Sequence, residues 1–305
     1  MIQRLVGSEM CIRDSLSALV IAHALSIRGL PAHPVGAEDI GVHLDGAGRA
    51  SRVDLDKSRA MLDRSAFHGV PVVTGWFGEG TDGDIALLGR GGSDHTATAL
   101  AALLQARRVT LWKDVSGIYP VNPRWGVQST PIPYLGYGEA IAFSNADATI
   151  LHPATVEPVY EMGIPIEIRH LAHHKNGAMK TIIGPDIEAT PNIKGIACTP
   201  RVAYVNAEVR YSQDAARALS DLLQELDEEG IRICSFETTN TQWRFVFLQH
   251  ELNRGVQIIN QHCSSVKYDY YAAMLSFIGC CDIEYLREQL GEQHDEETMP
   301  LYESA

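Results

Sequence analysis

The chain has 305 residues, 45% of them apolar, and a formal net charge of −13. This length and apolar content suffice for a full hydrophobic core and predict two domains. The acidic balance argues against a nucleic-acid surface, and no apolar run approaches the roughly 18–20 residues that cross a bilayer. The six cysteines lack metal-ligand spacing, so we expect them to be free thiols in the cytoplasm.

The chain begins with residues that match no signal peptide, because they lack an apolar core of roughly 7–15 residues and a small-residue cleavage site. We expect residues 1–15 to be foreign to the native protein and joined to a truncated reading frame. An amphipathic helix is predicted at 16–29, followed by a strand near 32–36 and a buried strand at 70–74. The glycine- and aspartate-rich residues 75–84 are expected to form a loop.

A glycine-rich stretch follows at residues 88–97, which read Leu-Gly-Arg-Gly-Gly-Ser-Asp-His-Thr-Ala. Its glycines allow a tight bend that brings backbone N–H groups close to an anion. A helix is predicted at 95–107, so the bend lies at a helix N-terminus, which attracts phosphate. Arg90 adds a charge, Ser93 a hydroxyl and Asp94 a carboxylate, and this combination favours phosphoryl transfer over a tight connection without a ligand.

A second stretch at 109–124 reads Val-Thr-Leu-Trp-Lys-Asp-Val-Ser-Gly-Ile-Tyr-Pro-Val-Asn-Pro-Arg. Residues 109–112 are predicted to be a short buried strand, and the glycine and prolines after them indicate an ordered loop. Ligands of open α/β sheets bind beyond the carboxyl ends of strands. The loop is therefore where we expect a nucleotide to bind.

Two helices are predicted at 137–143 and 146–162, and a strand at 165–169. The alternation of strands and helices up to this point favours an α/β fold with a largely parallel sheet covered by helices on both faces. Five glycine and proline residues between 184 and 200 then indicate a domain junction.

Beyond the junction the predicted order changes to βαββαβ, which is typical of ferredoxin-like modules. The predicted elements are a strand at 202–210, a helix at 214–229, strands at 231–236 and 243–249, a helix at 251–262 and a strand at 265–271. Residues 273–279 and 282–290 are predicted to be one further strand and helix.

Three motifs together resemble the aspartate kinases of the amino acid kinase family. The stretches above resemble that family's Gly-Arg-Gly-Gly-Ser-Asp loop and its Trp-Thr-Asp-Val-x-Gly-Ile-Tyr-x-x-Asp-Pro-Arg segment. Residues 148–155, Ala-Thr-Ile-Leu-His-Pro-Ala-Thr, resemble its Ala-Lys-Val-Leu-His-Pro segment. The βαββαβ module resembles an ACT domain, a small-molecule sensor found in aspartate kinases. The resemblance implies an amino acid kinase-like α/β fold followed by this sensor.

The expected domain organisation has five parts. They are the foreign residues 1–15, a partial amino acid kinase domain at 16–185, a linker at 186–200, an ACT domain at 201–272 and the start of an incomplete second ACT domain at 273–305.

The resemblance also implies roles for individual residues. Arg90 and Asp94 are the expected catalytic residues: Arg90 stabilises the transition state, and Asp94 orders the phosphates and the family's catalytic lysine. Arg90 and Ser93 are expected to contact the substrate. The residues expected to contact the nucleotide are Lys113, Asp114, Tyr119, Arg124 and Thr149. Lys113, Asn122 and Thr149 replace the family's threonine, aspartate and lysine, respectively. No residue is expected to form a protein metal site.

The implied activity is transfer of the γ-phosphoryl group of ATP to the side-chain carboxylate of L-aspartate, with Mg²⁺ bridging the phosphates. Its product, 4-phospho-L-aspartate, opens lysine, threonine and methionine biosynthesis. The resemblance further implies feedback by lysine or threonine and a homo-oligomer formed through ACT domains. The charge and the absence of a long apolar run lead us to expect neither nucleic acid nor membrane as partner.

Several alternatives stay open at this point. The family's opening Lys-Phe-Gly-Gly-Thr phosphate loop has no counterpart here, so we expect this chain to be a poor catalyst, and a catalytically silent regulatory subunit is one alternative. The substrate could instead be glutamate, carbamate or a nucleotide. The intact protein could also be fused to a diaminopimelate decarboxylase or a homoserine dehydrogenase.

Overall fold

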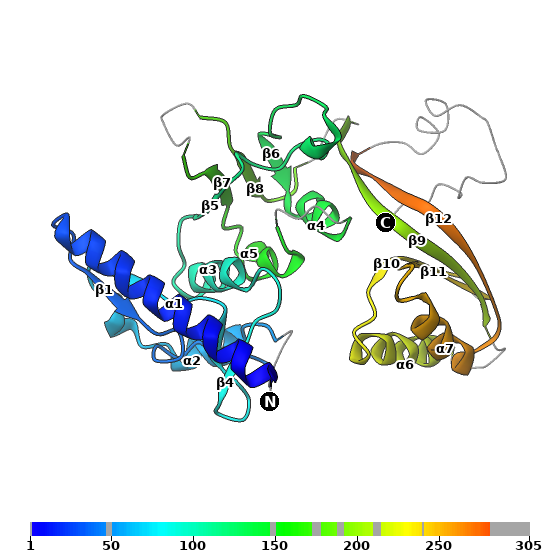
Figure 1. Ribbon diagram of the computed structural model, residues 1–305, viewed down its shortest axis with the longest axis horizontal. Helices are drawn as coiled ribbons and strands as arrows, with labels where there is room; N and C mark the ends of the chain where they lie inside the picture. The colour runs from blue at the N-terminus through cyan, green and yellow to red at the C-terminus, as the bar shows by residue number, and fades with distance from the viewer. Residues whose placement is uncertain are drawn as a thin grey trace. The chain divides into compact units, whose positions relative to one another are not determined.

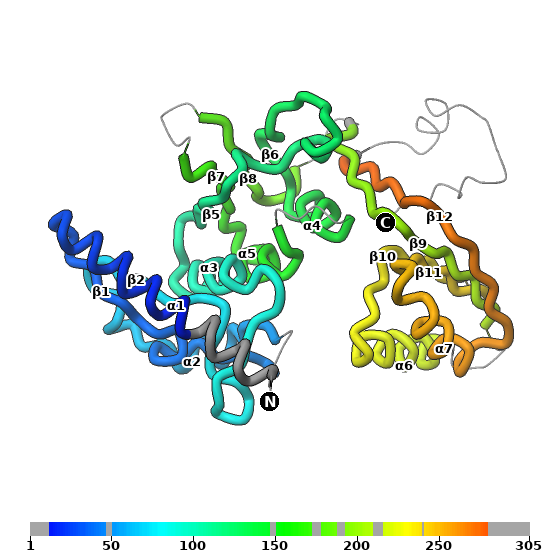
Figure 2. The backbone as a smooth tube through the Cα atoms, viewed as in Figure 1, coloured from blue at the N-terminus to red at the C-terminus, as the bar shows by residue number. Residues whose placement is uncertain are grey.

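The computed structural model describes residues 2–46, 51–146, 151–172, 178–187, 192–209, 215–239 and 241–280. The chain divides into two compact units, which are described separately below. One comprises Met1–Ser144 and Thr149–Ala189, and the other comprises Asn145–Ala148 and Thr190–Ala305. Figure 1 labels the helices and strands of both units, and Figure 2 traces the same backbone from end to end.

The first unit opens with α1 (Ile2–Ile27), which packs on the parallel strands β1 (Ala32–Val35) and β2 (Val70–Val73) (Figure 1). Ala18 and Ala22 lie on the packed side and are 4% and 2% exposed, because their small side chains let the helix approach the strands closely. The helix also includes residues 2–15, which precede the predicted helix start at residue 16 and for which no element was predicted. Among the described helices, none is long and apolar enough to cross a membrane.

The expected loop at 75–84 contains a β-hairpin instead, made of β3 (Phe77–Glu79) and β4 (Ile85–Leu87). Its turn closes through a hydrogen bond from Gly80 N–H to the Asp84 carbonyl, and Gly83 has a φ of 80°. Glycine and aspartate residues serve a tight turn as well as a long loop, which is why composition alone did not separate the two.

The remaining elements of the first unit form a four-stranded sheet and the helices around it. They are α2 (Leu55–Met61), η1 (Arg64–Ala66), α3 (Gly92–Leu103), β5 (Val109–Lys113), η2 (Pro123–Trp125), β6 (Tyr134–Gly136), α4 (Tyr137–Asn145), η3 (Pro153–Thr155), α5 (Glu157–Tyr160), β7 (Ile166–His170) and β8 (Thr181–Gly184).

This four-stranded sheet has the strand order β5-β7-β8-β6. The pairs β5–β7 and β6–β8 are parallel and β7–β8 is antiparallel, so the α/β class is confirmed with a mixed sheet. The predicted helix at 146–162 was wrong over its described part, which holds only the short η3 and α5. Pro153 and Pro158 account for this, because proline removes a backbone donor from a helix interior.

The second unit has the predicted βαββαβ order. Its elements are β9 (Asn192–Val209), α6 (Ala215–Glu228), β10 (Ile233–Thr238), β11 (Gln242–Leu248), α7 (Leu252–His262) and β12 (Cys263–Cys280). The strand order β10-β11-β9-β12, antiparallel throughout, is the ferredoxin-like arrangement. The helices lie on one face of this sheet (Figure 1), and the core between them includes Val205, Leu222, Phe245, Phe247 and Ile259.

Two expectations about the edges of this module need correction. Residues 192–200, expected to be linker, form the first half of β9, and residues 273–280 continue β12 rather than starting a separate strand. The two segments pair with each other, with Pro200 opposite Ala273 and Ile193 opposite Gly279. Their long-range pairing keeps the backbone extended despite the glycine and proline residues. Residues 281–305 lie outside the described part of the chain.

Candidate functional site

The glycine-rich loop is a tight turn between β4 and α3. Gly91 is the N-terminal cap of α3 and has a φ of 77°, in the left-handed region that glycine adopts readily. A Cβ atom on Gly91 would lie 2.6 Å from the Cβ of His152, so glycine also makes room for a second segment. The expected position of the loop at a helix N-terminus is confirmed. The helix begins at Gly92 rather than at residue 95, which places Ser93 and Asp94 in its first turn.

Trp76 holds this loop from another side. Its indole N–H donates to the Gly89 carbonyl over 3.0 Å, and its backbone N–H donates to Thr96 Oγ1 over 3.1 Å. A Cβ atom on Gly92 would lie 2.4 Å from the Cδ1 atom of Trp76. Trp76 has a φ of 75°, a strained value for a bulky residue and one typical of functional sites. Sequence reasoning missed it, although Gly75-Trp76 directly follows a predicted buried strand.

An ion pair joins the first motif to the second. The Nζ atom of Lys113 lies 2.5 Å from Oδ2 of Asp94, and the two side chains are 24% and 19% exposed. Lys113 is the last residue of β5, and Asp94 lies in the first turn of α3, where the helix dipole favours a carboxylate. A partly buried cation and carboxylate therefore meet where the strand ends and the helix begins.

His95 joins the first motif to the third. Its Nε2 atom accepts from the Val53 N–H over 3.0 Å, so Nδ1 carries the proton and donates to the Ala154 carbonyl over 2.5 Å. Burial lowers the pKa of His95 and so favours this neutral form. His152 accepts from the Ala154 N–H, which is a structural role. Sequence reasoning missed His95; a histidine facing the core side of a predicted helix was the available signal.

The loop after β5 is held by hydrogen bonds and lines a surface hollow. Thr181 Oγ1 accepts from the Ile118 N–H over 2.8 Å, and Asn122 Oδ1 accepts from the Arg124 N–H over 3.0 Å, which is the expected Asx turn. Tyr119 lines a hollow of about 510 Å³. The other residues that line it are Pro123, Val127, Gln128, Ser129 and Thr130.

The structure therefore brings together some of the predicted site residues. Asp94 and Lys113 are in contact. Ser93 and Arg90 belong to the same loop as Asp94, and both are exposed. Within the described residues, Tyr119 and Arg124 share no hydrogen bond or ion pair with Asp94 or Lys113. Asp114 is exposed at the end of β5, and Thr149 lies outside the described residues.

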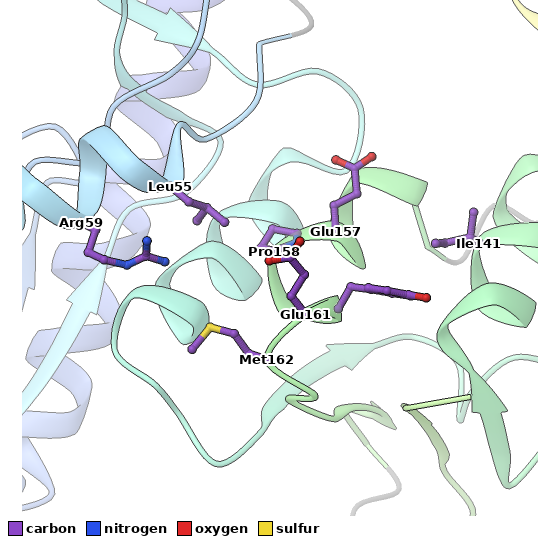
Figure 3. A pocket seen from close by; sticks show the side chains of 8 residues that line it. Leu55, Arg59, Ile141, Glu157, Pro158, Glu161 and Met162 are labelled. Atoms are coloured by element: carbon purple, nitrogen blue, oxygen red, sulfur yellow. The ribbon is translucent and has the colours of Figure 1, made fainter. Parts of the chain in front are cut away.

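A second hollow, of about 340 Å³, lies elsewhere in the first unit (Figure 3). It is lined by Leu55 and Arg59 of α2, Ile141 of α4 and five residues of the 157–162 segment. None of the predicted site residues lines it, so it is separate from the three motifs.

The site supplies few ligands for a metal ion of its own. Within the part of the chain that the structure describes, no three His, Cys, Asp or Glu side chains gather closely enough to hold one. The carboxylate of Asp94 already contacts Lys113. Mg²⁺ commonly binds through one or two carboxylates together with substrate phosphates. The residues present therefore fit an ion that arrives on a nucleotide better than a protein metal centre.

Comparisons with known proteins agree with this geometry. A family model described as "Amino acid kinase family" matches residues 9–170. The aspartokinase of Geobacillus stearothermophilus is 27% identical over 276 residues, which cover 87% of this chain and 66% of that protein. The chain thus spans just under two thirds of that relative's length.

Two solved structures share the fold. The structure of E. coli aspartokinase III in complex with aspartate and ADP superposes with a TM-score of 0.71 at 21% identity, covering 88% of this chain and 63% of that chain. The structure of the same enzyme with lysine and aspartate gives a TM-score of 0.63 at 22% identity, covering 86% of this chain and 60% of that one.

Proposed function

Because the chain belongs to the amino acid kinase family, we propose that it takes part in aspartate kinase chemistry, the transfer of the ATP γ-phosphoryl group to the side-chain carboxylate of L-aspartate. The observation that carries this proposal is the meeting of three motifs at the first turn of α3. Relatives named aspartokinase support the choice of substrate. The product is 4-phospho-L-aspartate, an acyl phosphate on the route to lysine, threonine and methionine.

The reaction needs no general base, because the attacking carboxylate is already ionised near pH 7. The protein supplies positioning and charge neutralisation. In this scheme the N–H groups of the glycine-rich loop and the Arg90 guanidinium face the charge that develops on the phosphoryl oxygens. Lys113 adds a second cation, which Asp94 holds in place. Ser93 contacts the aspartate.

The nucleotide would lie along the loop that follows β5. The hollow beside Tyr119 accepts the base, and Asp114 and Arg124 stand on the phosphate side. A Mg²⁺ ion held mainly by the phosphates would neutralise part of their charge. Thr149 is assigned to the nucleotide on its place in the third motif alone.

The second unit would provide regulation. We assign it the binding of an end-product amino acid, lysine or threonine, and self-association of the chain through the module at 201–272. The ferredoxin-like strand order supports a sensor module. A related structure that contains lysine supports an amino-acid effector. Regulation then follows from different effector affinities of two conformational states.

A hydroxylamine trap tests the proposal, because hydroxylamine converts aspartyl phosphate to aspartyl hydroxamate. We expect a low rate of hydroxamate formation, because the family's Lys-Phe-Gly-Gly-Thr loop has no counterpart in this sequence. The rate should depend on both ATP and L-aspartate and should fall about 100-fold in Arg90→Ala, as for loss of one transition-state contact. Arg107→Ala is the matched control, since Arg107 is exposed near the other end of α3. No hydroxamate at saturating ATP and aspartate refutes the activity of this chain, and binding of lysine or threonine alone then identifies a regulatory subunit.

A further inference from the structure

Hydrogen bonds from Trp76 reach three parts of the chain around the glycine-rich loop. Where the loop begins, the Leu88 N–H donates to the Trp76 carbonyl over 2.8 Å. Within the loop, the Gly89 carbonyl accepts from the Trp76 indole N–H over 3.0 Å. In helix α3 after the loop, Thr96 Oγ1 accepts from the Trp76 backbone N–H over 3.1 Å. One residue outside the loop is therefore bonded to its start, to its interior and to the helix that follows it.

The backbone that makes these bonds is strained. Trp76 has a φ of 75°, which a bulky residue seldom adopts. Directly before it, Gly75 lies against the first turn of α3, since a Cβ atom on Gly75 would be 3.3 Å from the Ser93 Cα. Strain of this kind persists only where the surrounding structure fixes it, and it is concentrated at functional sites. The strained residue and the first turn of α3 therefore hold each other in place.

The same bonds orient the peptide groups on both sides of residues 90–91. Thr96 Oγ1 donates to the Gly92 carbonyl over 3.0 Å, and the Gly92 N–H donates to the Gly89 carbonyl over 3.1 Å. Trp76 thus holds the Gly89 carbonyl directly and the Gly92 carbonyl through Thr96. In the part of the chain that the structure describes, no backbone carbonyl accepts from the N–H groups of residues 90–91, which leaves them to an anion.

The backbone held in this way sets the position of the Arg90 side chain. In the proposed function, the Arg90 guanidinium faces the charge that develops on the phosphoryl oxygens. A misplacement of about 1 Å at such a group costs up to roughly 100-fold in rate. Resting on that function, we propose that Trp76 is a positioning residue for phosphoryl transfer. Its indole N–H and its strained backbone hold the glycine-rich loop so that Arg90 is aimed at the transferring group.

Trp76→Phe tests this role in the full chain, because it removes the indole donor and keeps an aromatic ring. The Gly89 carbonyl keeps the Gly92 N–H as a partner, so no acceptor is left unpaired. In the hydroxylamine assay we expect kcat to fall about tenfold and the KM for ATP to stay within about twofold, because the loop after β5 is unchanged. Trp243→Phe, in β11 of the second unit, is the matched control and should leave both constants unchanged when no effector is added.

Thr96 provides a second test that leaves the tryptophan in place. Thr96→Val removes the hydroxyl that links the Trp76 N–H to the Gly92 carbonyl, so it should lower kcat by a similar factor. Thr96→Ser keeps a hydroxyl and should keep kcat within about twofold of the unmodified chain. Far-UV circular dichroism checks that each variant is folded.

Arg90→Ala separates the aiming of Arg90 from a general loss of structure. Once the guanidinium is gone, adding Trp76→Phe should change kcat by less than about twofold, because the effects of coupled residues are not additive. An unchanged kcat in Trp76→Phe, or a loss of about tenfold that persists beside Arg90→Ala, overturns the role of Trp76 and leaves the proposed function standing. Absence of hydroxamate from the unmodified chain refutes the proposed function, and the role of Trp76 falls with it.

Discussion

Replacing His95 by phenylalanine should loosen the junction of the first and third motifs. The ring is 4% exposed, and it pairs with the Val53 N–H at 3.0 Å and the Ala154 carbonyl at 2.5 Å. Phenylalanine fills a similar volume but leaves both backbone groups buried without a partner, at about 1–3 kcal/mol each. After a gain of about 1 kcal/mol from the more apolar ring, we expect a net loss of about 1–5 kcal/mol. The total free energy of unfolding of a typical domain is about 5–15 kcal/mol.

Native-state hydrogen exchange is the suitable assay, because a chain of two units need not unfold in a single step. The Val53 amide should lose protection by the predicted amount, together with the first turn of α3. His68→Phe is the control: His68 is exposed, its ring bonds the nearby Ser65 carbonyl and stacks on His33, and phenylalanine can keep the stacking, so a change under about 1 kcal/mol is expected. If His95→Phe changes Val53 protection by no more than the control does, the proposed role of His95 is wrong.

Two further predictions concern pH. Burial lowers the pKa of His95 in the folded chain, so the contribution of His95 to stability is complete above about pH 6.5 and is lost as the pH falls through the lowered pKa of the folded state. The urea concentration at the unfolding midpoint should therefore fall between about pH 7 and pH 5, and it should fall less in His95→Phe. Burial raises the pKa of Glu167, but hydrogen bonds from Lys180 and Arg169 outweigh it and the pKa is lowered. That contribution is present above about pH 4.5 and is lost below it, so Glu167→Gln should lower stability at pH 7 by about 1–3 kcal/mol and flatten acid unfolding followed by circular dichroism.

Local signals predicted most elements of the fold. The second unit was predicted nearly in full, because its strands alternate and its helices carry a clear apolar face. The errors arose where long-range pairing decides the structure. Residues 192–200 contain glycine and proline, yet they form a strand because residues 273–280 pair with them. The short strands β6 and β8 were missed for the same reason, since strands of three or four residues carry little periodicity of their own.

The candidate site was predictable as a set of motifs but not as a set of contacts. The glycine-rich loop predicted a helix N-terminus, and the cap of α3 at Gly91 confirms this prediction. The partner of Lys113 could not be deduced, because Asp94 lies nineteen residues away and on a different element. Trp76 and His95 were missed because their roles are to bond backbone groups of distant segments, which no local pattern records.

The charges at α3 explain how a chain with a net charge of −13 can present a site for an anion. The long-range field of the acidic residues is screened within about 8–10 Å at physiological salt. At the first turn of α3, the helix dipole and the partly buried Lys113 act over shorter distances and in a lower dielectric. Asp94 cancels the lysine charge only while the two remain paired. The pair is neutral overall, so the net attraction for a phosphate comes from the helix dipole, the backbone N–H groups of the loop and Arg90, and Lys113 adds to it only as its ammonium group shifts from Asp94 toward the phosphate.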